Sequence, residues 1–182
     1  YRVDSIAWKD DPFYGWLNKN PKPDGTRYDI DRDGLKIYTT IDSRMQKYAE
    51  EAVAEHLGSD LQKSFNSDLR HKRRRPFSND VSDDVIKLLM KQAVRWSDRY
   101  MSMKRDGISE SKIMASFEQP VNMRVFAWNK RHYIDTVMTP MDSIRYYKSF
   151  LRSAFIAVEP HTGHVKAYVG GLDYRYFKYD NA

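Results

Sequence analysis

A serine and a lysine three residues apart, Ser109 and Lys112, have a spacing that nucleophilic catalysis uses. A serine hydroxyl becomes a good nucleophile when a neighbouring base takes its proton, and a lysine one helical turn away is such a base. The same serine follows Gly107 and precedes a short helical pattern, where serine commonly caps a helix. Because short motifs count only in their structural context, we interpret Ser109 as a cap and assign no catalytic residue.

Three aspartates at alternate positions, Asp29, Asp31 and Asp33, precede Gly34 and match the front half of an EF-hand calcium loop. The bidentate glutamate of such a loop is replaced here by Thr40, so we interpret the run as an acidic turn without calcium. The histidines show no metal-ligand spacing. The sequence therefore predicts neither a metal nor a cofactor; the histidines are His56, His71, His132, His161 and His164.

The basic residues are unevenly placed along the 182-residue chain. The formal net charge is +6, and most of this excess comes from the run Arg70–Arg75. Such a run suits nucleic acid or anionic lipid headgroups. It lacks interleaved aromatic residues and any motif that enters a groove, so a solvated basic loop is the better interpretation.

Composition excludes several other classes. The chain has no cysteine, which excludes disulfides, thiolate metal sites and a cysteine nucleophile. No apolar run approaches the ~18 residues that a membrane span needs, and there is no signal-peptide pattern at Tyr1. The first residues read as mid-chain sequence, so we expect a piece of a longer protein.

The elements that would position any site are organised around a hairpin near the C-terminal end. Residues 154–158 are apolar throughout, which predicts a strand buried on both faces. Residues 164–169 alternate, which predicts a second strand. Pro160 and Gly163 supply the turn between them.

This hairpin needs partners, because an isolated two-stranded hairpin is marginal in water. Residues 35–41 alternate and are rich in β-branched side chains, so we expect them to form a third strand of the same sheet. Residues 43–57 have helical apolar spacing and would cover one face. Asp42 or Ser43 would cap this helix, Ser43 with Gln46 fits a capping box, and Gly58 would end it.

The residues between these segments predict a separate, mostly helical region. Residues 60–80 are polar and basic, and we expect a loop or a frayed helix there. A long helix should begin at Ser82 and end before Gly107. A second hairpin is expected over residues 121–138, and a helix capped by Thr139 should follow it.

Three stretches also resemble a known family. The run Ser153–Gly171, SAFIAVEPHTGHVKAYVGG, resembles the first hairpin of the transpeptidase domain in bifunctional, class A penicillin-binding proteins. Residues 34–53 resemble the strand and helix that open that domain, and residues 139–151 resemble the segment that leads into the hairpin. The three stretches occur in the family's order.

The resemblance implies a fold and a domain organisation. The fold would be α+β, a small antiparallel sheet with packed helices, interrupted by a mostly helical insertion that carries its own β-hairpin. Residues 1–34 would be an extended, aromatic-rich linker arm. Residues 35–57 and 152–182 would form the split N-terminal part of the transpeptidase domain, and residues 58–151 would be the inserted subdomain.

The resemblance also implies a function for the parent protein. It would polymerise lipid-linked disaccharide and crosslink stem peptides through a serine acyl-enzyme, the step that β-lactams block. It would be anchored in the cytoplasmic membrane and face the periplasm. Its partners would be the glycosyltransferase and transpeptidase domains of the same chain and peptidoglycan or cell-wall regulatory proteins. This chain would be a non-catalytic region that ends before the serine motif.

The family's catalytic set is S-x-x-K, then S-x-N, then K-T-G. Ser64–Asn66 fits the second motif and His161–Gly163 is close to the third, but Ser64 precedes Ser109 and the third lies in a turn. We therefore assign no catalytic, cofactor or metal residue. Two other classes stay open: a stand-alone protein-interaction module, and a nucleic-acid-binding protein that uses the basic run. An S-x-x-K soon after Ala182 would decide for the family.

Overall fold

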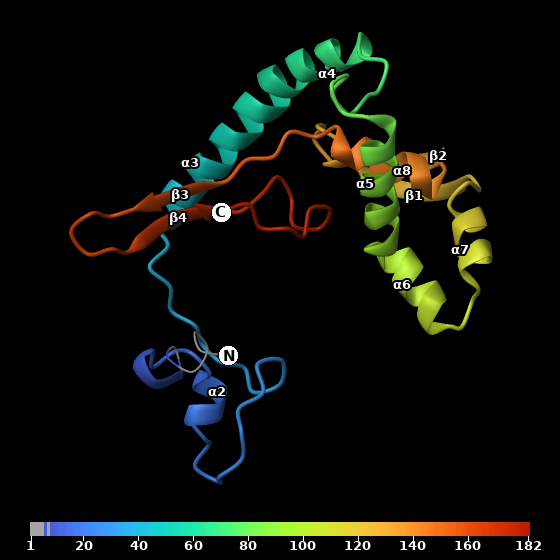
Figure 1. Ribbon diagram of the computed structural model, residues 1–182. Helices are drawn as coiled ribbons and strands as arrows, with labels where there is room; N and C mark the ends of the chain where they lie inside the picture. The colour runs from blue at the N-terminus through green and yellow to red at the C-terminus, as the bar shows by residue number, and fades with distance from the viewer. Residues whose placement is uncertain (1–5, 7) are drawn as a thin grey trace. The chain divides into compact units, whose positions relative to one another are not determined.

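The computed structural model describes residue 6 and residues 8–182, in two compact units. The units are Tyr1–Thr39 and Thr40–Ala182. The described residues contain several helices and two small antiparallel sheets (Figure 1), which confirms the predicted α+β class. The first residues of the predicted linker arm, 1–5 and 7, lie outside the described residues.

The first unit contains the short helix α2 (Trp16–Lys19) and aromatic rings that pack within the unit. The rings of Trp16 and Tyr28 lie 5.3 Å apart between centroids. An ion pair of 2.6 Å joins Lys22 Nζ to Asp33 Oδ1. These contacts fold the described part of the segment back on itself, and that residues 1–34 form a linker arm stays a prediction.

The second unit begins with a long helical rod. It consists of α3 (Ser43–Val53), a π-helical stretch η1 (Ala54–Leu61) and α4 (Gln62–Arg70), which follow one another without a break. Asp42 caps the rod, since its carboxylate accepts two backbone N–H groups of the first turn at 2.9 and 3.2 Å. The predicted end at Gly58 was therefore wrong. Of the two alternatives for residues 60–80, a loop or a frayed helix, the helix holds as far as residue 70.

Gly58 has a packing role instead of a capping role. A Cβ atom added at this position would lie 2.7 Å from Cε3 of Trp128, closer than real Cβ contacts come. The bare backbone of the rod thus lets the Trp128 indole approach it. Glycine costs helix stability, and here the cost is offset by this contact.

The predicted C-terminal hairpin is confirmed. β3 (Phe155–Val158) pairs antiparallel with β4 (Val165–Val169), and Gly163 takes a φ of 71° in the turn. One face of the hairpin packs on the rod. The core of this packing consists of Ala49, Val53, Ala157, Ala167 and Val169.

The expected burial of β3 on both faces was wrong. Phe155, Ile156 and Val158 are each about half exposed (45–52%). The reason is that the rod covers only one face of the two-stranded sheet. Ile156 pairs with Tyr168, which is 39% exposed, so the opposite face is open to solvent within the described chain.

The predicted third strand, residues 35–41, was also wrong. These residues have no strand structure, and Ile37 and Tyr38 are 76% and 89% exposed. The contacts with β4 begin only at the end of the stretch, where Thr40 Oγ1 donates to Val165 O at 2.7 Å. β-branched residues favour a strand only where a neighbouring edge supplies a hydrogen-bond ladder.

The region between the rod and the hairpin is mostly helical and carries its own hairpin, as predicted. Its strands pair in register from Val121↔Met138 to Phe126↔Tyr133. Its elements in chain order are α5 (Asp83–Arg95), α6 (Asp98–Arg105), α7 (Glu110–Ser116), β1 (Val121–Phe126), β2 (Tyr133–Met138) and α8 (Pro140–Lys148).

The single long helix predicted from Ser82 is in fact two helices, α5 and α6. Ser97 interrupts it: its hydroxyl donates to the Val94 carbonyl at 2.6 Å and accepts from the Tyr100 backbone N–H at 3.3 Å. A serine side chain that competes for backbone groups favours a helix end over a helix interior. The apolar stripe on which the prediction of one long helix rested includes Val94, and Val94 packs against α7.

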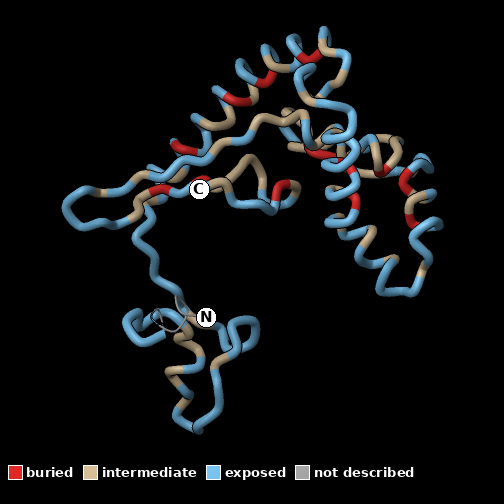
Figure 2. The backbone as a smooth tube through the Cα atoms, in the orientation of Figure 1, coloured by how far each residue is buried: buried red, intermediate tan, exposed pale blue. Residues whose placement is uncertain are grey.

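Phe126 lies at the centre of a second core. It is fully buried, and the rings around it have centroids 5.1–6.0 Å from its own. Figure 2 shows how buried positions recur along the rod and on the helices of this region. The core therefore ties β1 to the residues that follow α8 and to the C-terminal segment; its rings belong to Trp128, His132, Phe150, Tyr176 and Phe177.

In the described part of the chain, every helix is too short or too polar to cross a bilayer.

Candidate functional site

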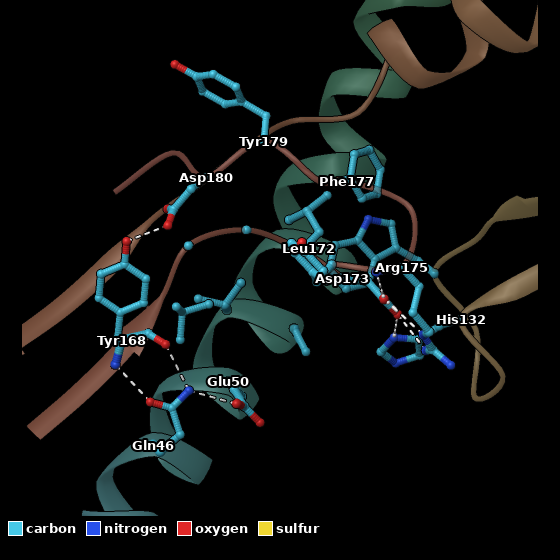
Figure 3. A pocket seen from close by; sticks show the side chains of 17 residues that line it. Gln46, Glu50, His132, Tyr168, Leu172, Asp173, Arg175, Phe177, Tyr179 and Asp180 are labelled. Carbon is cyan, nitrogen blue, oxygen red and sulfur yellow. Dashed lines mark hydrogen bonds and ion pairs between the residues drawn. The ribbon is translucent and has the colours of Figure 1, made fainter. Parts of the chain in front are cut away.

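A cleft of about 470 Å³ lies where the rod, the β1–β2 turn and residues 170–182 meet (Figure 3). Each wall comes from a different part of the second unit. The lining side chains that carry polar groups are Gln46, Glu50, Trp128, His132, Tyr168, Asp173, Tyr174, Arg175, Tyr179 and Asp180.

Gln46 joins the rod to β4 by a two-point contact. Its amide Nε2 donates to the Tyr168 carbonyl at 2.9 Å, and the Tyr168 N–H donates to its Oε1 at 2.8 Å. The second Nε2 proton goes to Glu50 Oε1 at 2.8 Å. A side-chain amide thus supplies the donor and acceptor that a neighbouring strand would supply.

Asp173 is the least exposed carboxylate of the cleft, with 9% of its side chain accessible. Arg175 binds it with two guanidinium nitrogens, Nε at 3.0 Å and Nη2 at 2.6 Å. These hydrogen bonds hold the pKa of Asp173 below its ordinary value. His132, which adopts a φ of 60° in the β1–β2 turn, lies 3.5 Å away through Nδ1.

Tyr168 and Asp180 close the other side of the cleft. The Tyr168 hydroxyl donates to Asp180 Oδ2 at 2.5 Å. This hydrogen bond raises the pKa of Tyr168 and lowers the pKa of Asp180, because it favours the proton on the phenol and the charge on the carboxylate.

Most polar groups of the cleft are bound to one another, which suits them to positioning. Its described lining has no serine, threonine, cysteine or lysine. The carboxylates of Asp173 and Asp180 have lowered pKa values, so they stay charged near neutral pH and are poor general acids. The buried Nε1 of Trp128 has no acceptor in the described chain. The arrangement fixes the C-terminal segment against the rod and the β1–β2 turn.

The serine-lysine pair of the sequence lies elsewhere, on α7. Ser109 is the N-cap residue of that helix, and its Oγ lies 3.3 Å from the Oγ of Ser111. None of the hydrogen bonds of the described residues joins Ser109 to Lys112. The structure thus gives Ser109 the capping position that the sequence predicted, while its lack of a catalytic role stays a prediction.

The other two motif candidates each have a local partner. In Ser64–Asn66, on α4, the Asn66 Oδ1 accepts from Gln62 Nε2 at 2.9 Å. In His161–Gly163, within the β3–β4 turn, Thr162 Oγ1 donates to Glu159 Oε2 at 2.7 Å. The three motifs lie on three different elements, and no hydrogen bond of the described chain connects one with another.

The acidic turn uses its carboxylates internally. Asp33 accepts the Asp29 N–H at 2.6 Å and pairs with Lys22, and Asp29 accepts the Asp31 N–H at 2.9 Å. Among the described residues, no group of three or more acidic or histidine side chains is placed to hold a metal ion. That calcium does not bind there stays a prediction.

The basic run is not one uniform exposed loop, and the prediction was wrong for Arg74. Its side chain is 26% exposed and pairs with Asp83 at 2.8 Å. The same guanidinium donates to the carbonyls of Asn79 and Val81 at 3.0 and 2.7 Å. Arg74 therefore holds the connection between α4 and α5.

Sequence reasoning missed the two glutamines that organise the second unit. Gln46 was considered only as a capping partner. Gln62, which is 3% exposed, donates to the Ser149 carbonyl at 2.9 Å and accepts the Leu151 N–H at 2.9 Å. An amide in a helical pattern gives no signal of a partner 87 residues away. The sequence around Asp173 and Arg175 also gave no signal that these residues would line a cleft.

The comparisons with known proteins fit this architecture. Residues 72–151 match the family model for the penicillin-binding protein middle domain. The curated "Penicillin-binding protein 2D" of Bacillus subtilis (strain 168) is 48% identical over 44 residues, which are 23% of this chain and 6% of that protein. No solved structure matches the chain. Both matches are to penicillin-binding proteins, and the chain spans only a small part of that relative.

Proposed function

We propose that the chain is the non-catalytic linker and insertion region of a class A peptidoglycan synthase. In this proposal residues 1–34 are the linker arm, and residues 35–57 with 152–182 begin the transpeptidase domain. Residues 58–151 are the inserted subdomain. One observation carries the proposal: the stretch that matches the penicillin-binding protein middle domain, residues 72–151, lies between two segments that pack on each other.

The packing of the flanking segments supports a domain interrupted by an insertion. The Gln46–Tyr168 contact spans 122 positions of the chain, and Ala49 shares a core with Ala167 and Val169. The free energy of closing a loop rises only with the logarithm of its length, so a long insertion is tolerated between two packed segments. The stretches that resemble the opening of the transpeptidase domain are these two flanks.

The parent protein would carry the chemistry. In the proposal it polymerises glycan and crosslinks stem peptides through a serine acyl-enzyme on the periplasmic side of the membrane, with its anchor outside these residues. The glycosyltransferase and transpeptidase domains would be the partners of this chain. The cleft around Asp173 would hold the start of the transpeptidase domain against the inserted subdomain.

Labelling with a fluorescent penicillin tests this proposal. The full-length parent should be labelled, and the isolated 182-residue chain should not, because the chain lacks an ordered set of serine motifs. A covalent adduct on the isolated chain that disappears in Ser109→Ala would show that the chain is itself catalytic. An unlabelled parent would count against the family assignment.

A further inference from the structure

A second concave surface, a groove of about 500 Å³, lies between α4 and α8. Three arginines from three different elements line it. Arg70 ends α4, Arg75 follows in the connection to α5, and Arg145 comes from α8. The fold therefore adds a distant arginine to two members of the basic run, which the sequence alone did not indicate.

The charge of this groove is poorly compensated. The side chains of Arg70 and Arg75 make no ion pair and no hydrogen bond with any other described residue. Arg145 Nη1 contacts Asp142 Oδ1 at 3.2 Å, and Asp142 is the single acidic residue in the described lining. Arg74, by contrast, does not line the groove, and its guanidinium binds Asp83 and the carbonyls of Asn79 and Val81. The groove thus has two guanidinium groups without a counter-charge.

The floor of the groove strengthens its attraction for an anion. Leu69, which is 6% exposed, and Pro76 and Met138 contribute apolar surface to the lining. A charge beside low-dielectric material interacts more strongly with an incoming ion than a charge fully in water does. The Asn66 Oδ1 accepts from Gln62 Nε2, so the Nδ2 of the same amide is the atom that could donate to an anion.

We propose that this groove binds a phosphate-bearing anion, held by the guanidinium groups of Arg70, Arg75 and Arg145. Planar guanidinium groups bind phosphate oxygens in a bidentate manner and keep their charge at any physiological pH. The volume of the groove is in the range of small-ligand sites and leaves room for more than one phosphate. The inference goes beyond the proposed function and does not depend on it.

Titration with inorganic pyrophosphate at low salt, followed by calorimetry, tests the site. Arg70→Ser, Arg75→Ser and Arg145→Ser should each weaken binding about tenfold, the loss expected for a charge-assisted hydrogen bond. Arg73→Ser is the matched control: it removes the same charge from the same run but does not line the groove. It should change the affinity by less than about twofold. Thermal melting of each variant verifies the fold.

Vesicles distinguish the source of the phosphate. Sedimentation with vesicles of phosphatidylglycerol and phosphatidylcholine, compared with phosphatidylcholine alone, reports binding to a lipid headgroup. If the protein sediments with the anionic vesicles, and Arg145→Ser abolishes this sedimentation, the phosphate belongs to a lipid headgroup. Pyrophosphate binding without vesicle binding supports a soluble or polymeric phosphate. Both results require the same three arginines.

Three results would overturn the proposal. The first is the absence of binding to both pyrophosphate and anionic vesicles. The second is an equal loss in Arg73→Ser and Arg70→Ser, which would show a diffuse effect of the basic run. The third is duplex DNA binding that is tighter than pyrophosphate binding and unaffected by Arg145→Ser, since DNA would then use the run without the groove.

Discussion

The side-chain amide of Gln46 forms hydrogen bonds with both backbone groups of Tyr168, at 2.9 Å to its carbonyl and 2.8 Å from its N–H. One glutamine of the rod thereby occupies the free hydrogen-bonding edge of β4. Because both backbone groups of Tyr168 are already hydrogen-bonded, a further strand could not pair with β4 at this position. This contact is the polar counterpart of the apolar packing between Ala49 and Ala167.

Gln46→Ala should lower the free energy of unfolding by about 1 to 2 kcal/mol, because the two hydrogen bonds to Tyr168 and the exposed one to Glu50 are lost while Tyr168 keeps solvent access. Urea unfolding measures this change. The matched control is Gln92→Ala, on the exposed side of α5, which should change stability by no more than about 0.5 kcal/mol. Equal effects of the two substitutions would contradict a special role for Gln46.

Gly58→Ala should have opposite effects in two backgrounds. In the natural chain the new methyl group meets Trp128 at 2.7 Å, and we expect destabilisation by about 1 kcal/mol or more. In a Trp128→Ala background the clash is gone, and alanine should stabilise the rod by up to about 1 kcal/mol. Thermal and urea unfolding of the natural chain, the two single variants and the double variant measure the change in stability that Gly58→Ala causes in each background. The same sign in both backgrounds would argue against the Gly58–Trp128 contact.

Arg74→Ser and Arg73→Ser should differ, although the residues are neighbours. Loss of the Arg74 guanidinium breaks its bonds to Asp83, Asn79 and Val81, and should cost about 2 kcal/mol. Arg73→Ser removes an exposed side chain and should change stability by less than about 0.5 kcal/mol. Denaturant midpoints of the two variants give the comparison, and similar midpoints would refute the role of Arg74.

Asp173 should make stability depend on pH in the acidic range. Because its folded pKa lies below the unfolded value, its stabilising contribution is present above about pH 4 and is lost as pH falls through the folded pKa. The stability difference between the natural chain and Asp173→Asn should therefore narrow as pH falls below about 4. Urea midpoints measured from neutral to acidic pH test this. A difference that stays constant or widens would show that the Asp173 carboxylate is not stabilised by Arg175.

Local patterns predicted much of the fold. The hairpin at β3–β4 and the one at β1–β2 were found because alternation and turn residues are local signals. Thr139 was predicted as a cap and Ser82 as the start of a helix, and the hydroxyl of each accepts a backbone N–H of the first turn. These features depend on residues a few positions apart, so a single sequence contains the information.

The errors came from contacts between distant segments. Gly58 was read as a helix end because its partner, Trp128, lies 70 positions further along the chain. Residues 35–41 have the composition of a strand but no ladder, and Ile37, 76% exposed, should tolerate an aspartate that a buried sheet position would not. The arginine groove could not be predicted from the sequence, because Arg145 comes near Arg70 only in the folded chain, where α8 and α4 both line the groove.

The central claim is that the rod and the C-terminal hairpin form one folding unit around an inserted region, and hydrogen exchange of Ala167→Asp tests it most directly. Ala167 is 1% exposed beside Ala49, so a charge there should open this core. We predict that amides of α3 and β4 lose protection together while β1 and β2 keep theirs, and that Ile156→Asp, on the exposed face, leaves all of them protected. If α3 stays protected while β4 exchanges, the two segments are not one unit, and the interrupted-domain account is wrong.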